Sequence, residues 1–372
     1  MSDGALMGRA LQAVDTPALV VDLDAMARNI ERMASYARNH GLRLRPHAKT
    51  HKSAWIAAQQ IAAGAVGVCV QKTSEAEALA AAGVTDIYVT NQVIDHAKLA
   101  RLARLAQRCT LAVAVDSALG IQRLATAVKH AGCSLDVFIE IDVGHGRCGA
   151  PALQAGVLAR LALASGLHFA GLQAYHGRAQ HVREAAERTA VIAHAATSVR
   201  DALTALSQAD VACPLVTGAG TGSFVLEAAS GLWGELQAGS YVFMDRDYAD
   251  NAPLAQAPGF EHALFVKSQV ISRADDHAVI DAGHKCHAID SGLPVVWGRS
   301  DLAYVNGGDE HGVLRRREAA ARLPELGDTV WLIPGHCDPT VNLHDRLVGV
   351  RGGLAHGTVE RLITVDARGC LT

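Results

Sequence analysis

The sequence predicts a (β/α)8 barrel followed by a mainly β domain. Three observations support this fold class. Short apolar runs alternate with Ala/Leu-rich segments from about residue 42, eight such runs occur before about residue 245, and helix formers become sparse after about residue 262. Because 50% of the 372 residues are hydrophobic, the chain can bury one large core and a smaller one.

The eight barrel strands are expected where a short apolar stretch is bounded by polar or Gly-containing loops. They cover residues 42–50, 67–72, 86–92, 111–117, 135–144, 169–177, 214–223 and 235–245. The segments between them are rich in helix formers, and several end in Gly, where left-handed caps fall. Alternating strands and helices imply parallel strands, and eight units favour a closed barrel over an open doubly wound sheet.

We expect the barrel to occupy residues 25–262 and the β domain to occupy residues 263–372. The β domain shows strand-like runs with little helix between them: "ALFVKSQVISR", "HAVIDAGH", "PVVWG", "LAYVNGG", "DTVWLIPG", "RLVGVRGG" and "VERLITV". The early run "TPALVVDLD", within residues 1–24, is expected to add a strand to this domain. Residues 24–41 then form a helix that leads into the barrel.

Composition narrows the classes of partner. The net charge is −3, and Lys and Arg are scattered without a basic stripe, so we expect a small-molecule substrate rather than nucleic acid or a membrane. No apolar run approaches the roughly 20 residues that span a bilayer, and the start of the chain lacks the pattern of an export signal. Eight cysteines without a CxxC pair are typical of free thiols. These features indicate a cytoplasmic protein.

Residues with reactive side chains gather where the predicted barrel strands end, which is where such barrels carry their active sites. The first strand ends in "RPHAKTHK", and burial there would lower the pKa of Lys49 enough for it to form an imine. A solvated loop lysine is the alternative. The fifth strand ends in "DVGHGRCG", with Arg147, and the sixth ends in "QAYHGR", with Tyr175 and His176.

A Gly-rich turn, "TGAGTGS", follows the seventh strand and precedes a helix, so its N–H groups can hold a phosphate. Its spacing matches neither a P-loop nor a dinucleotide fingerprint. Loops after strands seven and eight are the usual phosphate site of such a barrel, and "QAGSY" adds small residues there; a plain tight turn is the alternative. The expected cofactor contacts are Thr217, Gly218, Gly220, Thr221, Gly222, Gly239, Ser240 and Tyr241.

A phosphate cradle that faces Lys49 across the barrel mouth indicates a phosphorylated aldehyde bound as a Schiff base. Pyridoxal 5'-phosphate accounts for both features. Arg147 would contact the phenolic oxygen of its ring, with a salt bridge to Asp142 or Glu140 as the alternative. Tyr175 is expected beside the cofactor or the substrate.

The longer motifs together resemble one family of enzymes. "TPALVVDLDAMARNI", "RPHAKTHK", "DVGHGRCG", "GLQAYHG", "TGAGTGS", "DEHG" and "PGHCDPTVNLHD" are similar to the fold-type III pyridoxal-phosphate enzymes that comprise D-threonine aldolase and the related D-serine and D-threo-3-hydroxyaspartate dehydratases. The resemblance covers nearly the whole chain. It implies an alanine-racemase-like barrel, a homodimer, a Schiff-base lysine at Lys49, and a divalent metal as second cofactor.

The resemblance also places a metal pair on "PGHCD". The family pattern is His-x-Asp in the aldolases and His-x-Cys in the dehydratases, and His336 and Asp338 follow the aldolase pattern. If the segment is extended, these two side chains point to one side and Cys337 to the other. A nitrogen and oxygen pair of this kind suits Mn²⁺ or Mg²⁺.

The expected reaction is retro-aldol cleavage of D-threonine and related D-3-hydroxy amino acids to glycine and an aldehyde. His176 is the candidate base, metal-bound hydroxide competes with it, and His311 is a weaker candidate for the substrate pocket. Dehydration to ammonia and a 2-oxo acid uses the same groups and stays open. A pyridoxal-phosphate carrier would lack the β domain with its His/Asp pair, and a metal-dependent hydrolase would leave Lys49 and the Gly-rich turn unexplained.

Overall fold

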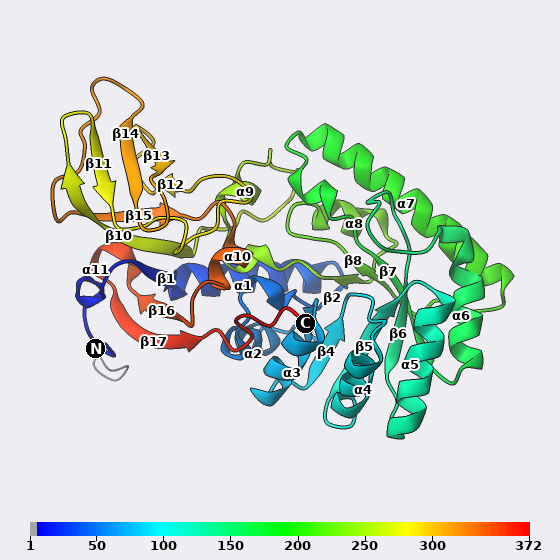
Figure 1. Cartoon of the computed structure of the whole chain (residues 1–372). Coiled ribbons are helices and arrows are strands. Elements are labelled where there is room, and N and C mark those ends of the chain that lie inside the picture. Colours follow the sequence, from blue (N-terminus) through cyan, green and yellow to red (C-terminus); the bar gives the residue numbers. More distant parts are fainter. Residues whose placement is uncertain (1–5) are drawn as a thin grey trace.

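The computed structural model describes residues 6–372, and its larger domain is a barrel of parallel strands with helices outside (Figure 1). The strands run in the order β2-β9-β8-β7-β6-β5-β4-β3. Their bounds are β2 (Arg43–Leu44), β3 (Val68–Val70), β4 (Asp86–Val89), β5 (Thr110–Val115), β6 (Asp136–Glu140), β7 (His168–Ala174), β8 (Val216–Gly218) and β9 (Glu235–Leu236). All eight predicted segments therefore contain a strand.

The ring of strands closes just beyond β2. His47 forms a parallel bridge with Cys69 of β3, and the Cys69 N–H donates to the Pro46 carbonyl over 2.9 Å. On its other side, the Arg45 N–H donates to the carbonyl of Leu236 in β9 over 2.9 Å. The predicted (β/α)8 barrel is confirmed, and closure places the residues after β2 beside those after β9.

Seven helices follow the strands and cover the outside of the barrel. They are α2 (Ala54–Ala62), α3 (Thr73–Ala81), α4 (His96–Leu105), α5 (Ala118–Ala131), α6 (Ala155–Ala164), α7 (Ala185–Gln208) and α8 (Phe224–Ser230). An eighth, α1 (Leu23–Asn39), precedes β2 and begins at Asp22, whose carboxylate accepts from the N–H groups of Asp24 and Ala25. Within residues 6–372, no helix is long and apolar enough to cross a membrane.

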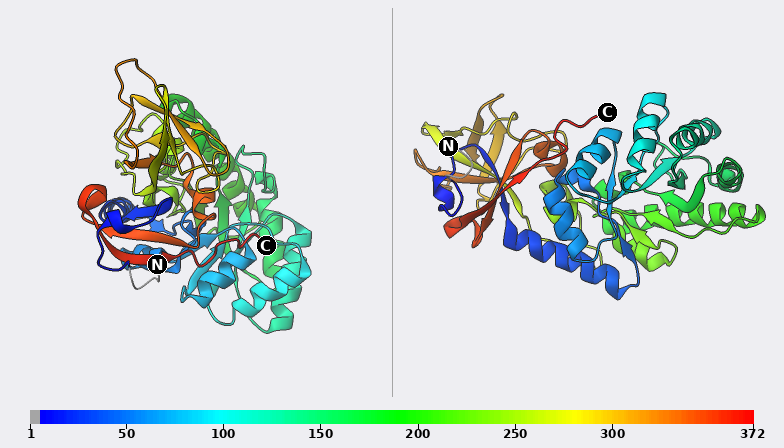
Figure 2. Two further views of the ribbon diagram at one scale, coloured as in Figure 1. Left: turned by 60° about the vertical axis from the view of Figure 1, so that its left-hand side comes forward. Right: turned by 90° about the horizontal axis from the view of Figure 1, so that it is seen from below.

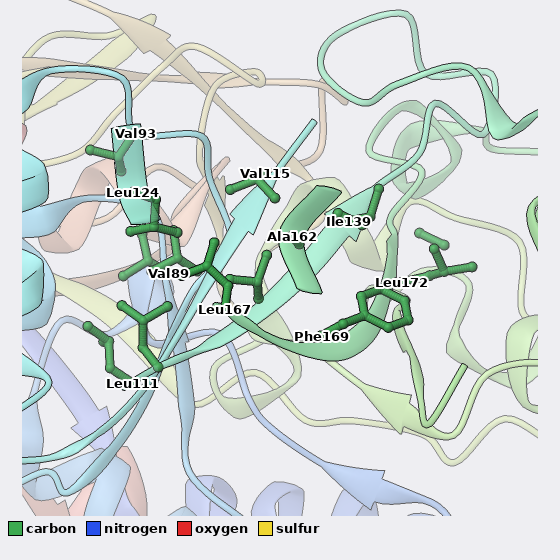
Figure 3. Packing of buried hydrophobic residues seen from close by; sticks show 14 of the residues in the cluster. Val89, Val93, Leu111, Val115, Leu124, Ile139, Ala162, Leu167, Phe169 and Leu172 are labelled. Carbon is green, nitrogen blue, oxygen red and sulfur yellow. The ribbon is translucent and has the colours of Figure 1, made fainter. Parts of the chain in front are cut away.

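Alternate residues of the barrel strands pack in two directions. On the outer face Val89, Leu111, Ile139 and Leu172 are buried against the helices (Figure 3). The intervening residues, such as Tyr88, face the interior of the barrel. The interior is therefore filled by side chains, and the open space lies at one end of the barrel.

The second domain is built on a nine-stranded sheet. Its strands run in the order β13-β14-β11-β10-β1-β16-β17, with β15 paired to β10 and β12. Their bounds are β1 (Ala18–Asp22), β10 (Leu264–Arg273), β11 (His277–Ile280), β12 (Val295–Val296), β13 (Leu302–Asn306), β14 (Gly312–Arg316), β15 (Thr329–Ile333), β16 (Arg346–Arg351) and β17 (Thr358–Thr364). The sequence did not predict β14, because consecutive arginines hide its apolar face.

The N-terminal strand lies inside this C-terminal sheet. β1 pairs antiparallel with β10, where Val20 lies opposite Phe265, and parallel with β16, where Val20 lies opposite Val348. Figure 2 shows the blue N-terminal segment running beside the orange-red strands near the C-terminus, and the yellow β10 is its other neighbour. Short helices α9 (Arg246–Ala249) and α10 (Cys337–Val341) lie between the two domains, and α11 (Gly353–His356) joins β16 to β17.

Gly171 in β7 provides a test of barrel packing. It follows a bulge opposite β6, its φ is +143°, and a Cβ there would lie 1.9 Å from the Leu215 carbonyl oxygen. Gly166 has a positive φ of +79° but open space around it. We expect Gly171→Ala to lower the free energy of unfolding by about 1–3 kcal/mol more than Gly166→Ala, since only the first is overpacked. Chemical denaturation measures both, and equal losses would contradict the packing explanation.

Candidate active site

A cavity of about 390 Å³ lies at the C-terminal ends of the barrel strands. Of the residues expected at the site, those that line it are Lys49, Arg147, Tyr175, Gly220, Thr221, Gly239, Ser240 and His336. Among the described residues, those expected at the site that do not line it are His176, Thr217, Gly218, Gly222, Tyr241, His311 and Asp338. The cavity therefore joins barrel loops to one residue of the β domain.

Lys49 lies in a short 3-10 turn, Ala48–Thr50, which begins four residues after the end of β2. Its Nζ forms an ion pair with Asp338 of α10. Burial alone would lower the pKa of Lys49, but the Asp338 carboxylate outweighs burial and raises this pKa to about 12. The sequence did not reveal this effect, because Asp338 lies 289 residues further along the chain.

His47 lines the cavity next to Lys49, and the sequence analysis assigned no role to it. Its Nδ1 accepts from the Lys49 N–H over 3.3 Å, and its Nε2 lies 3.2 Å from the Thr90 hydroxyl. Burial holds the pKa of His47 well below its usual value. Burial therefore favours the neutral ring, whose Nδ1 is an acceptor and whose Nε2 lies within hydrogen-bond distance of both the Gln71 amide nitrogen, at 2.9 Å, and the Thr90 hydroxyl.

The Gly-rich turn after β8 lies against the loop after β9. A Cβ on Gly220 would lie 2.4 Å from Gln180 Oε1, and one on Gly239 would lie 2.7 Å from the His47 carbonyl oxygen. The Thr221 hydroxyl accepts from the Tyr241 N–H over 3.0 Å. The turn thus brings small residues and hydroxyl groups to the cavity, as a bound phosphate group requires.

Other residues of the two predicted loops have structural partners. The Thr217 hydroxyl donates to Glu235 over 2.9 Å, and the Tyr241 hydroxyl accepts from Gln60 over 3.1 Å. A Cβ on Gly218 would lie 2.2 Å from the Ala174 carbonyl oxygen, so this glycine is needed for strand packing. The Gly222 N–H donates to Gln180 over 2.8 Å. Their role in binding a cofactor stays a prediction.

Arg147 lies above the ring of Tyr175, with its guanidinium carbon 5.8 Å from the ring centroid. In the described part of the chain it forms no ion pair with Asp142 or Glu140. Asp142 instead accepts from the N–H groups of Gly144 and Gly146, over 2.9 and 3.1 Å, and so shapes the loop that carries Arg147. The guanidinium is therefore available to an anion in the cavity.

His176, the predicted base, lies behind the cavity wall. Its ring stacks on that of His145 with centroids 5.8 Å apart, and its Nδ1 accepts from the Ala179 N–H over 3.1 Å. Burial lowers the pKa of His176. His145 lines the cavity in front of it. His311 is exposed, on the loop before β14, and is not among the described residues that line the cavity.

His181 lines the cavity and was missed by the sequence analysis. Its Nδ1 lies 2.6 Å from Asp247 Oδ2, and Asp247 also pairs with Arg183. Burial raises the pKa of Asp247, but hydrogen bonds from His181 and Arg183 outweigh it, so this pKa stays below its usual value. The only sequence signal for His181 was its place in a loop of the barrel. Its partner, Asp247, is distant in the chain.

The metal pair lies where α10 begins. His336 is the residue before the helix, with φ −144° and ψ 124°, and Asp338 is in its first turn. The prediction of an extended segment is therefore wrong beyond His336, where the helix begins. The two side chains converge nevertheless, with His336 Nε2 4.0 Å from Asp338 Oδ2, while Cys337 is fully buried in the core of the β domain.

The His336 and Asp338 side chains fit a hard divalent cation. In the described chain, Asp338 Oδ1 is buried without a hydrogen-bond partner, as a free ligand atom would be. Burial raises the pKa of Asp338, but Lys49 and His336 outweigh it and keep the carboxyl ionised. No third His, Cys, Asp or Glu completes a cluster within residues 6–372. Water or substrate would supply the remaining ligands of an ion bound here.

Comparisons with known proteins follow the same division into two domains. The model of the alanine racemase N-terminal domain matches residues 21–247, and that of the putative serine dehydratase domain matches residues 263–350. D-threonine aldolase from Arthrobacter sp. is 45% identical over 97% of this chain and 95% of its own. The chain belongs to the D-threonine aldolase family. This confirms the resemblance drawn from the motifs.

Other relatives share the sequence or the fold of this chain, and their names give more than one reaction. The 3-hydroxy-D-aspartate aldolase of Paracoccus denitrificans is 44% identical over 98% of this chain and 95% of its own. The crystal structure of D-threonine aldolase from Filomicrobium marinum has a TM-score of 0.94 and 47% identity, covering 98% of this chain and 99% of that one. The D-threo-3-hydroxyaspartate dehydratase of Delftia sp. HT23 has a TM-score of 0.84 and 29% identity, covering 95% and 98%.

Cys337 lies between the two predicted metal ligands and tests their assignment. Because its side chain is fully buried among apolar residues, we expect Cys337→Ser to lower the free energy of unfolding by about 1–3 kcal/mol. The dependence of activity on added Mn²⁺ should stay as in the wild type. Denaturation and Mn²⁺ titration measure the two effects, and a lost response to Mn²⁺ would make the thiol a ligand.

Proposed function

We propose that this protein cleaves D-threonine and related D-3-hydroxy amino acids to glycine and an aldehyde, with pyridoxal 5'-phosphate and a divalent metal. Mn²⁺ is the metal we favour, and Mg²⁺ is second. The observation that carries the proposal is the contact between Lys49 of the barrel and Asp338 of the β domain beside one cavity. One substrate at this cavity can therefore meet a lysine-bound cofactor and a metal.

The barrel loops would hold the cofactor. Lys49 would bind its aldehyde carbon, Gly220 and Thr221 would face its phosphate together with Ser240, and Arg147 would lie near its ring. When bound, pyridoxal phosphate supplies a ring that accepts the electron pair left on Cα. The backbone of the Gly-rich turn would lie close to the phosphate, since Gly220 has no room for a side chain.

His336 and Asp338 would hold the metal. A bound divalent cation acidifies a hydroxyl group that coordinates it, and the relevant group here is the β-hydroxyl of the substrate. An aspartate at the second position of the pair follows the aldolase pattern, in which both ligands are hard. The same pair would also assist loss of the hydroxyl in a dehydration, so the metal alone does not select the reaction.

His181 is the base that the geometry favours, ahead of His176 and of metal-bound hydroxide. It lines the cavity, and Asp247 accepts from its Nδ1–H, which leaves the Nε2 lone pair to take a proton. His176 has its Nδ1 occupied by a backbone N–H and is covered by His145. It stays the second candidate.

Dehydration is the second candidate function. The D-threo-3-hydroxyaspartate dehydratase of Delftia sp. (strain HT23) is 35% identical over 90% of this chain and 93% of its own. We further propose a cytoplasmic homodimer, on the resemblance to the family. Light scattering of the purified protein tests the dimer.

Product analysis separates the two reactions. We expect D-threonine, pyridoxal phosphate and Mn²⁺ to give glycine and acetaldehyde in equal amounts, and removal of the metal with a chelator to stop product formation. Lys49→Ala should lose both the products and the visible absorbance band of the bound cofactor. Ammonia with a 2-oxo acid would show a dehydratase, and a variant that keeps the band would contradict the role of Lys49.

The two histidines can be told apart by substitution. We expect His181→Ala to lower kcat by about 10²–10⁴-fold, the usual contribution of a general base, with the Kd for Mn²⁺ unchanged. His176→Ala should lower kcat less, because its ring does not reach the cavity. Steady-state kinetics at saturating metal measure both. A greater loss in His176→Ala would restore His176 as the base.

A further inference from the structure

His336 is held by a carboxylate from a separate loop of the β domain. Asp290, on the segment between β11 and β12, places its Oδ2 2.7 Å from His336 Nδ1. The Ser291 hydroxyl lies 3.3 Å from the same nitrogen and donates to Asp290 Oδ2 over 3.1 Å. Both of these contacts at Nδ1 therefore come from two consecutive residues.

We propose that Asp290 is a positioning residue that fixes His336 for metal binding. An ionised carboxylate can only accept, so the proton of the imidazole lies on Nδ1 and the lone pair lies on Nε2. Nε2 is the nitrogen that faces Asp338, 4.0 Å from Oδ2. A carboxylate behind a ligating histidine sets its tautomer and ring orientation in this way. The inference depends on the metal pair of the proposed function.

The loop that carries Asp290 is fastened to α10. The Ala288 N–H donates to the Thr340 hydroxyl over 3.0 Å, and that hydroxyl donates to the His336 carbonyl oxygen over 2.7 Å. The two segments are also closely packed beside these hydrogen bonds, since a Cβ on Gly335 would lie 2.1 Å from the Gly292 carbonyl oxygen. The carboxylate is thus presented to His336 by a fixed backbone.

The ion pair between Asp290 and His336 is poorly placed to stabilise the fold. The Asp290 side chain is 52% exposed, and exposed pairs add little stability because water screens them. The imidazole is more enclosed, at 21%. Such a pair can still orient the imidazole ring. Ring orientation depends on the direction of the hydrogen bond, which water does not screen.

A second Asp–His pair in the same domain provides a matched control. Asp276 Oδ1 lies 2.7 Å from His277 Nδ1, with the Asp276 side chain 67% exposed. Neither residue is among the described residues that line the cavity. Asp276→Ala therefore removes the same kind of hydrogen bond without touching the metal pair.

The experiment measures binding of Mn²⁺ to the pyridoxal-phosphate-loaded protein by the electron paramagnetic resonance signal of the free ion. We expect Asp290→Ala to raise the Kd by about 10–100-fold, as loss of such a partner does elsewhere. Asp290→Asn should raise it less, because its amide oxygen still accepts from Nδ1–H. Asp276→Ala should leave the Kd unchanged.

The outcomes separate this inference from the proposed function. Wild-type protein that does not bind Mn²⁺, or His336→Ala that binds it equally well, would overturn the metal pair itself. Loss of binding in His336→Ala with an unchanged Kd in Asp290→Ala would overturn only the role of Asp290. An equal loss in Asp290→Asn and Asp290→Ala would mean that charge attraction is responsible, and this too would overturn the positioning role.

Discussion

The contact between residues 245–247 of the barrel and residues 334–337 of the β domain determines the whole site. The N–H groups of Arg246 and Asp247 donate to the carbonyls of Pro334 and Gly335 over 3.1 and 3.2 Å. The buried carboxylate of Asp245 accepts from the Cys337 N–H over 2.9 Å. Hydrogen bonds to backbone groups have a narrow range of length and direction. These three bonds therefore fix where α10 begins relative to the barrel mouth.

Three functions meet at this contact. Asp247 both donates its N–H to Gly335 and accepts from His181, so the candidate base and the start of the metal segment share one residue. Asp338, three residues beyond Gly335, reaches Lys49. This junction of the two domains therefore relates the base to the metal pair, the ion pair between Lys49 and Asp338 adds the lysine, and neither domain alone contains the complete set.

The sequence predicted the features that depend on neighbouring residues in the chain, and it missed those that depend on residues far apart in the chain. The eight barrel strands were found because apolar runs and turns repeat along the chain, whereas β14 was not recognised because two of its five residues are Arg315 and Arg316. The raised pKa of Lys49 and the pairing of His181 depend on carboxylates that are 289 and 66 residues away. Folding alone brings such groups together. The convergence of His336 and Asp338 was expected for an extended segment and is produced instead by the first turn of a helix.

The place of β1 makes the β domain discontinuous in the chain. During synthesis β1 emerges from the ribosome before the barrel, whereas its partners β10 and β16 emerge only after all of the barrel strands. Until then the backbone groups of a central strand lack their partners. A chimera that exchanged only residues 263–372 between relatives would keep the old strand in the middle of the new sheet. The unit that evolution or a designer can exchange is therefore residues 263–372 together with Ala18–Asp22.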